Sequence, residues 1–80
     1  MPKDIFVLGK RYAVLIGSAP DNMYMEVTDV VGGTCVLGIT QDDAAGARTL
    51  TTFDSPLPVA LINQALSIFE DEVQWPIPKI

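Results

Sequence analysis

The sequence predicts an α+β fold: a four- or five-stranded antiparallel meander, forming a curved sheet or half-barrel, with one C-terminal helix packed on one face. Two observations support this prediction. The first two-thirds of the chain consists of short runs rich in β-branched and aromatic residues, separated by turn residues, which is typical of antiparallel strands. After residue 55 the apolar residues change to a helical spacing. With 80 residues, the chain has room for a single domain, residues 1–80.

The expected strands are separated by sequences with strong turn preferences. Gly9-Lys10 lies between the first two apolar runs and indicates a type II′ hairpin, unless a short leading segment precedes one strand from about residue 10. Pro20 and the two residues after it supply the next turn, and residues 41–46 form a polar loop. The expected strands cover about residues 5–8, 11–17, 23–30, 34–40 and 47–53.

The pairing of the third and fourth strands depends on the length of the loop between them. A two-residue loop at 32–33 would place polar and apolar residues opposite one another. A three-residue loop at 31–33 shifts the register by one residue, so that Met25 faces Ile39 and the apolar faces coincide. We therefore expect the longer loop, with Gly33 in the left-handed conformation that such a loop requires. The same register pairs Val27 with Leu37 and Asp29 with Cys35.

The helix is expected over about residues 56–73. Ser55 can cap its N-terminus, and Pro56 suits the first turn, where a missing N–H does no harm. Leu61 and Ile68 form either a second contact surface or the margin of a wide core stripe. The stripe expected to cover the sheet consists of Val59, Ile62, Leu66, Phe69 and Val73.

The C-terminal end of the chain departs from local rules in two ways. The last helical turn carries Glu70, Asp71 and Glu72, although the helix dipole favours cations there. These acids are either a solvated face or a docking patch for a basic protein. The apolar tail 74–80 contains two prolines at alternate positions, which favour extended backbone. Its Trp75 either packs on its own sheet or anchors in a neighbouring chain.

Composition argues against several classes of function. Ten acidic and five basic residues give a net charge of −5, so we expect no binding to nucleic acid. Without histidine, the usual zinc ligand and neutral-pH general base are missing, and we expect no metal, cofactor or catalytic site. Cys35 is expected to be a small buried hydrophobe, and Asp42-Asp43 to be turn residues. With no secretory signal and no apolar run of membrane-spanning length, no membrane association and a cytoplasmic location are expected.

The apolar content, 49%, is more than so small a domain can easily bury, because about a third of its surface stays exposed. We therefore expect a non-catalytic protein-interaction module that acts as a homodimer or higher homo-oligomer. A related hypothesis is an acidic inhibitor or adaptor that binds a basic protein through residues 70–72. The expected contact residues between subunits are Leu61, Ile68, Trp75, Ile77 and Ile80.

The alternative hypothesis belongs to a different class of protein. A curved sheet can hold an apolar small molecule in a groove, and methionine side chains adapt to varied ligand shapes. The expected groove residues are Tyr12, Met23, Tyr24 and Met25.

Overall fold

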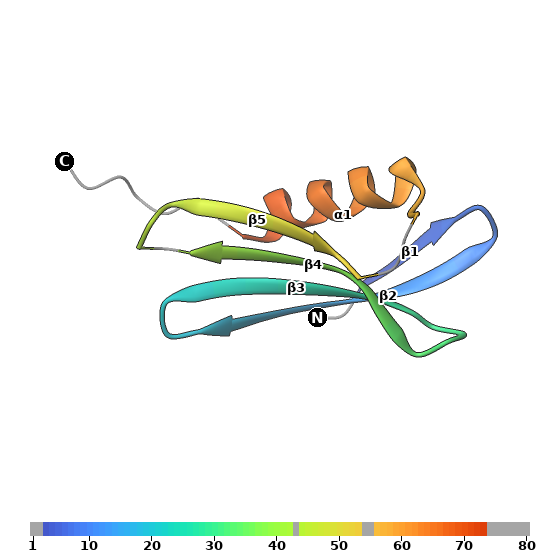
Figure 1. The fold of residues 1–80 in the computed structure, drawn as a ribbon, viewed down its shortest axis with the longest axis horizontal. Helices are drawn as coiled ribbons and strands as arrows, with labels where there is room; N and C mark the ends of the chain where they lie inside the picture. The colour runs from blue at the N-terminus through green and yellow to red at the C-terminus, as the bar shows by residue number, and fades with distance from the viewer. Residues whose placement is uncertain (1–2, 43, 54–55, 74–80) are drawn as a thin grey trace.

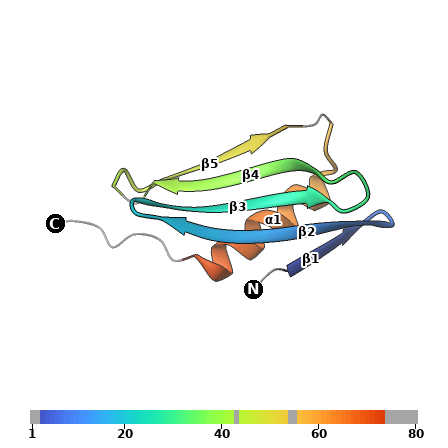
Figure 2. The same ribbon diagram turned by 90° about the horizontal axis from the view of Figure 1, so that it is seen from below.

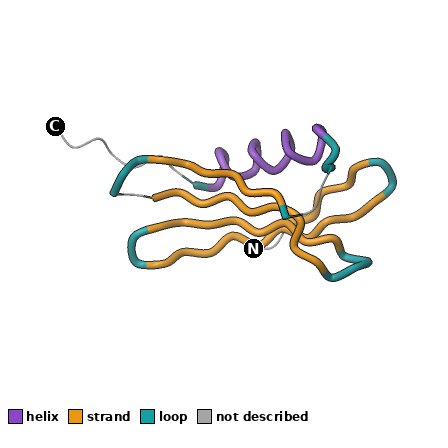
Figure 3. Tube along the Cα trace, viewed as in Figure 1, coloured by secondary structure: helices purple, strands orange, loops and turns teal. Residues whose placement is uncertain are grey.

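The computed structural model describes residues 3–42, 44–53 and 56–73 and confirms the predicted fold class. Each strand pairs antiparallel with the next, giving a five-stranded open sheet in the order β1-β2-β3-β4-β5 (Figure 1). One helix lies against one face of this sheet (Figure 3). The elements are β1 (Lys3–Val7), β2 (Lys10–Ala19), β3 (Asn22–Asp29), β4 (Thr34–Asp42), β5 (Ala47–Thr52) and α1 (Val59–Glu72).

The core lies between α1 and the sheet face that it covers. Alternation along the strands sends every second side chain to this face, except at a bulge in the β3–β4 pairing, where the adjacent Val36 and Leu37 are both buried. On β3, for example, Met25 and Val27 are fully buried, whereas Glu26 between them is exposed. The other buried sheet residues are Ile5, Val7, Tyr12, Val14, Val36, Leu37, Ile39 and Gln41.

The prediction of which helix face covers the sheet was wrong in part, because Val73 is buried and Ile62 packs against the core as expected, but two other members of the stripe are exposed. Val59 and Leu66, expected in the covered stripe, are 69% and 38% exposed. Leu61, expected beside the stripe, is fully buried together with Ala65, while Phe69 is buried as predicted. Apolar residues lie on most sides of this helix, so their spacing alone did not fix its rotation. Leu61 therefore belongs to the core and not to a second contact surface.

The helix begins at Val59, three residues later than predicted. Its N-cap is Pro58, whose backbone is extended and whose carbonyl accepts hydrogen bonds from the N–H groups of Leu61 and Ile62. Pro56 therefore precedes the helix instead of forming its first turn. The predicted cap, Ser55, lies outside the described residues.

The predicted register of β3 and β4 is confirmed over most of the hairpin, and wrong near its loop. Met25 pairs with Ile39, and Val27 pairs with Leu37, as expected. Beyond Val27 a β-bulge shifts the register, so that Thr28 rather than Asp29 lies opposite Cys35. The bulge follows from a four-residue loop, 30–33, in which Gly33 has the predicted left-handed conformation (φ 71°). A bulge leaves one extra residue on the longer strand.

The first hairpin turns one residue earlier than expected. Val7 pairs with Lys10, so the turn residues are Leu8 and Gly9 rather than Gly9 and Lys10. Both have positive φ, 52° and 77°, which is the signature of a type I′ turn. A left-handed conformation costs about 1–2 kcal/mol for a residue with a Cβ atom. Leu8, which is 85% exposed, gains no packing to offset this strain.

We expect Leu8→Asn to stabilise the protein by about 1 kcal/mol, because asparagine tolerates the left-handed region and favours type I′ turns. Thermal unfolding should show a rise in Tm of roughly 4–8 °C for a domain of this size. Val31→Asn is the control, since Val31 is 89% exposed and its φ is not positive. An equal rise in the control would assign the gain to lost surface hydrophobicity and not to relief of strain.

Arg48 joins the edge strand β5 to the C-terminal end of α1. Its Nη2 donates a hydrogen bond of 2.8 Å to the carbonyl oxygen of Val73, and its Nε donates one of 2.5 Å to Oε1 of buried Gln41. The guanidinium lies 5.0 Å from the centre of the Phe69 ring. A cation at this position satisfies the helix dipole and a terminal carbonyl together. The missing cation of the last helical turn is thus supplied by the sheet.

Arg48→Met should destabilise the fold by about 2–4 kcal/mol, because it leaves a buried amide oxygen and a helix-terminal carbonyl without their charged donor. Urea unfolding followed by circular dichroism measures the change. Arg11→Met is the matched control, because Arg11 forms an exposed ion pair with Asp4 and should cost less than about 1 kcal/mol. Similar losses in both variants would refute a special role for Arg48.

Candidate functional site

None of the described elements covers the sheet face opposite α1, and this face holds a groove of about 780 Å³. Figure 2 looks onto this open face, with α1 behind the strands. The groove runs over β3 and β4 and is shallow and open to solvent. Its main lining side chains are Asn22, Tyr24, Glu26, Cys35, Thr40 and Phe53.

Two aromatic rings and two glycines shape the groove. The Phe53 ring overhangs Gly38, since a Cβ atom at that glycine would lie 3.4 Å from the ring. The Tyr24 ring lies across the neighbouring strand on Gly17, where a Cβ atom would come within 2.4 Å of it. The glycines therefore let both rings lie close to the backbone. Both rings and Gly38 belong to the lining of the groove.

Glu26 places a carboxylate inside this mostly apolar groove. It lies on β3, paired with Leu15 of β2 and Gly38 of β4, and it is exposed. The described residues form no ion pair with it. An apolar groove with one such anion suits a partner that presents apolar groups beside a cation.

Cys35 is half-buried and lines the groove, rather than being fully buried as predicted. Its thiol contacts the carbonyl oxygen of Leu37 at 3.5 Å. The β-bulge explains its position, because the shifted register pairs Cys35 with Thr28 on the open face.

The predicted subunit-contact residues are only partly described by the structure. Leu61 is buried in the core, so it cannot contact a second chain in this fold. Ile68 is half-buried and packs against the core. Trp75, Ile77 and Ile80 lie outside the described residues.

The predicted acidic docking residues differ in their surroundings. Glu70 and Asp71 are exposed on the last turn of α1. Glu72 forms an ion pair with Lys3 of β1, and this hydrogen bond and charge hold the pKa of Glu72 below its ordinary value of 4.5. One of the three acids is therefore already partnered within the chain.

The predicted ligand-groove residues are divided between the two faces of the sheet. Tyr12 and the Met25 side chain are buried in the core, and half-buried Met23 packs against it. Tyr24 alone among the four presents its side chain to the open-face groove. Alternation along β3 separates Tyr24 from its methionine neighbours, a signal that was present in the sequence. Sequence reasoning missed most of the other groove residues, among them Glu26, Gly38 and Phe53.

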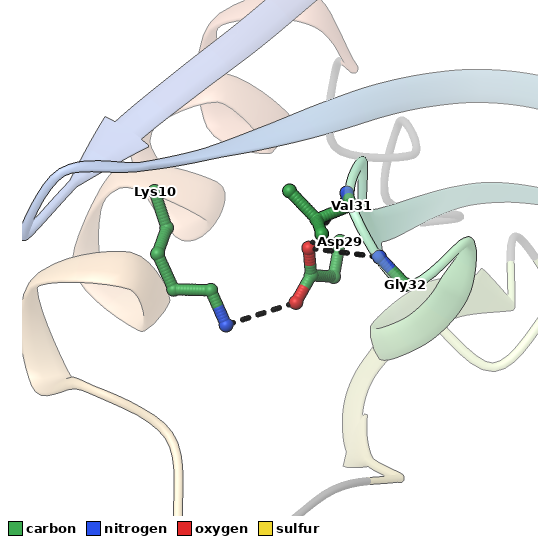
Figure 4. Close-up of polar contacts among 4 residues, drawn as sticks. All are labelled: Lys10, Asp29, Val31 and Gly32. Atoms are coloured by element: carbon green, nitrogen blue, oxygen red, sulfur yellow. Dashed lines mark hydrogen bonds and ion pairs between the residues drawn. The ribbon is translucent and has the colours of Figure 1, made fainter.

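A polar cluster joins the β1–β2 turn to the β3–β4 loop (Figure 4). The Asp29 carboxylate accepts hydrogen bonds from the N–H groups of Val31 at 3.0 Å and Gly32 at 3.5 Å, and Lys10 Nζ lies 2.9 Å from its other oxygen. The hydrogen bond from Lys10 is the main cause that lowers the pKa of Asp29 below its ordinary value of 3.8. We interpret this cluster as loop-stabilising structure.

The described residues contain no group of three potential metal-ligating side chains, and none of their helices is long and apolar enough to cross a membrane. Comparisons with family models, curated proteins and solved structures found no match. The open-face groove is therefore the candidate functional site.

The lowered pKa of Asp29 predicts a pH-dependent contribution to stability. A carboxyl whose pKa is lower in the folded state stabilises the fold above its unfolded pKa, and this contribution is lost as the pH falls through the folded value. Asp29→Asn should therefore be less stable than the parent chain near neutral pH, and the difference should shrink below about pH 4. Thermal unfolding between about pH 7 and pH 2.5 measures this difference.

Asp21→Asn is the control, since Asp21 lies in the exposed turn between β2 and β3 and forms no ion pair among the described residues. It should change stability little at any pH. A constant deficit for Asp29→Asn across the range would show that the ionised carboxylate is not what stabilises the loop.

Proposed function

We propose that this chain is a non-catalytic protein-interaction module that acts as a homo-oligomer, most simply a dimer, through the open face of its sheet. The supporting observation is the groove beside Tyr24 and Phe53, an apolar surface that the single described helix leaves uncovered.

The placement of the exposed apolar side chains supports an assembly surface on this face. Phe6, Leu15 and Phe53 are 67%, 53% and 63% exposed. Strand alternation puts Phe6 and Leu15 opposite the buried core positions, and Phe53 lines the groove. Apolar side chains that stay exposed on the same face as an apolar groove add to the area that a partner can bury there.

The shape of the groove favours a macromolecular partner over a small molecule. Small-molecule sites usually bury about 70–90% of their ligand. This groove is shallow and open to solvent, so a compact ligand would keep one side in water. A second protein chain covers such a surface and the neighbouring Leu15 at the same time.

This proposal moves the expected subunit contact from the helix to the sheet. Leu61 no longer belongs to it, and Phe53 takes the central place. The version with a basic partner protein remains a separate proposal, supported by the exposed carboxylates of Glu70 and Asp71.

A small-molecule site in the same groove is the second candidate. Its support is the volume of about 780 Å³, which is within the usual range for ligand pockets, and the single carboxylate of Glu26. The matching ligand is an apolar amine, because the carboxylate would pair with its cation.

Phe53→Ser should weaken self-association at least tenfold, because it removes a large apolar side chain from the proposed contact surface. Light scattering on a sizing column, over a range of protein concentrations, measures the change in the dimer dissociation constant. The matched control is Val59→Ser on α1, since Val59 is 69% exposed on the helix, away from the open face.

The proposal expects the parent chain and Val59→Ser to form dimers, and Phe53→Ser to become monomeric at the same concentrations. A parent chain that remains a monomer at all concentrations would refute the homo-oligomer. If an apolar amine raised the Tm of that monomer, and did not raise the Tm of Glu26→Gln, the result would favour the small-molecule site.

A further inference from the structure

We propose that the groove on the open face binds the C-terminal segment 74–80 of a second copy of this chain, with Lys79 of that segment against Glu26. This inference rests on the proposed function, because it specifies how the homo-oligomer assembles. Each subunit of an exchanged dimer would donate its segment and receive the other.

The groove has the features that recognise proline-rich segments. Such segments dock in shallow grooves lined by aromatic side chains, and they gain affinity because their extended backbone is already restricted. Here Phe53 lies over Gly38 and Tyr24 lies over Gly17, so two aromatic rings line the groove.

The C-terminal segment has the matching chemistry. Its sequence is Gln-Trp-Pro-Ile-Pro-Lys-Ile, in which two prolines alternate with large apolar residues and a lysine. Proline fixes φ near −65°, so less conformational entropy is lost when the segment docks in an extended form. Trp75 and Ile77 supply apolar surface, and Lys79 supplies one positive charge.

The distribution of cations on the described residues points to Lys79 as the partner of Glu26. The chain has five basic residues. Four are engaged within the described structure: Lys3 with Glu72, Lys10 with Asp29, Arg11 with Asp4, and Arg48 with Gln41 and the Val73 carbonyl. Lys79 is the fifth. The exposed carboxylate of Glu26 and the charge of Lys79 are therefore complementary.

The same carboxylate argues against direct stacking of two open faces. Glu26 lies in the middle of the groove region, between Leu15 and Gly38 on its neighbouring strands. Face-to-face stacking would bring two such carboxylates into a shared apolar interface without a cation, and unpaired buried charge is strongly unfavourable. A segment that contains Lys79 covers the apolar groove and neutralises Glu26.

The length of the segment favours binding to the groove of a second copy over binding to the groove of its own chain. Val73 belongs to the core between α1 and the sheet, and its carbonyl accepts a hydrogen bond from Arg48, whereas the groove lies on the opposite face. Six residues from Val73 to Lys79 span at most about 20 Å. Passing from the helix layer around the edge of the sheet, and then crossing β5 and β4 at about 4.8 Å each, would use most of that reach. Little would be left to lie along the groove.

The decisive experiment mixes two charge-reversed full-length variants, Glu26→Lys and Lys79→Glu. Each alone places like charges in both grooves of an exchanged dimer, so its dimer dissociation constant should rise about tenfold or more. In a mixed dimer, the two substituted side chains meet in one groove as an ion pair of reversed polarity, and the parent pair of Glu26 and Lys79 forms in the other. Mixing should therefore restore dimers at concentrations where each variant alone is monomeric.

Glu70→Lys is the control for net charge, because it makes the same reversal on the exposed last turn of α1, away from the groove. It should dimerise like the parent chain and should not pair selectively with Lys79→Glu. Light scattering on a sizing column measures the mass of each variant and each mixture.

A second readout uses the single cysteine of the chain. Cys35 is half-buried in the groove, so a docked segment should slow its reaction with a thiol reagent. Trp75→Ala should raise this rate several-fold relative to the parent chain at the same concentration, and Glu70→Lys should not.

The results separate this inference from the proposed function. Dimers that depend on Phe53 but are unaffected by both charge reversals and by Trp75→Ala would refute segment exchange and retain the open-face assembly. A monomer whose Cys35 is protected by Trp75 would overturn the second copy in favour of the chain's own segment. Failure of the mixture to restore dimers would also overturn the proposal.

Discussion

The contact of Arg48 with the C-terminal end of α1 is the interaction on which the arrangement of the two layers depends. The arginine begins on the edge strand β5, and its guanidinium reaches Gln41 on β4, the ring of Phe69 and the carbonyl of Val73. Arg48 therefore holds the C-terminal end of α1 against the β4–β5 side of the sheet. At the other edge, the ion pair between Lys3 and Glu72 joins the last turn of α1 to β1. The acidic last turn, unfavourable for an isolated helix, is compensated by cations that the sheet supplies.

The one described helix, held in this way, covers one face of the sheet. The side chains at the alternate strand positions form the other face. Those positions carry Leu15, Tyr24 and Glu26 together with two glycines that let aromatic rings approach the backbone. The same alternation that fills the core thus builds the groove. The described residues form five strands and one helix, and none of these elements is left over to cover the second face.

Predictions from the sequence were right where a local pattern was compatible with one structure. They were wrong where several structures fitted the pattern and tertiary contacts determined which one forms. Alternation fixed the pairing of Met25 with Ile39, but the bulge before Thr28 depends on the loop that the chain adopts. The helix had apolar residues on most sides, so periodicity could not say that Leu61 and Ala65, rather than Val59 and Leu66, would face the sheet. Glu26 and Gly38 could have been found, because the confirmed register places them opposite one another; the overhang of Phe53 could not.

Net charge does not prevent the assembly of an acidic chain with itself. Two bodies of charge −5 at a separation of about 25 Å repel by roughly 4 kcal/mol in unscreened water, but salt at physiological strength, with a Debye length of about 8 Å, reduces this to a few tenths. Burying one large apolar side chain contributes about 1.5–3 kcal/mol. Local chemistry therefore decides the geometry of contact: the exposed ring of Phe53 favours burial, and the carboxylate of Glu26 selects against any partner surface that brings no cation to the groove.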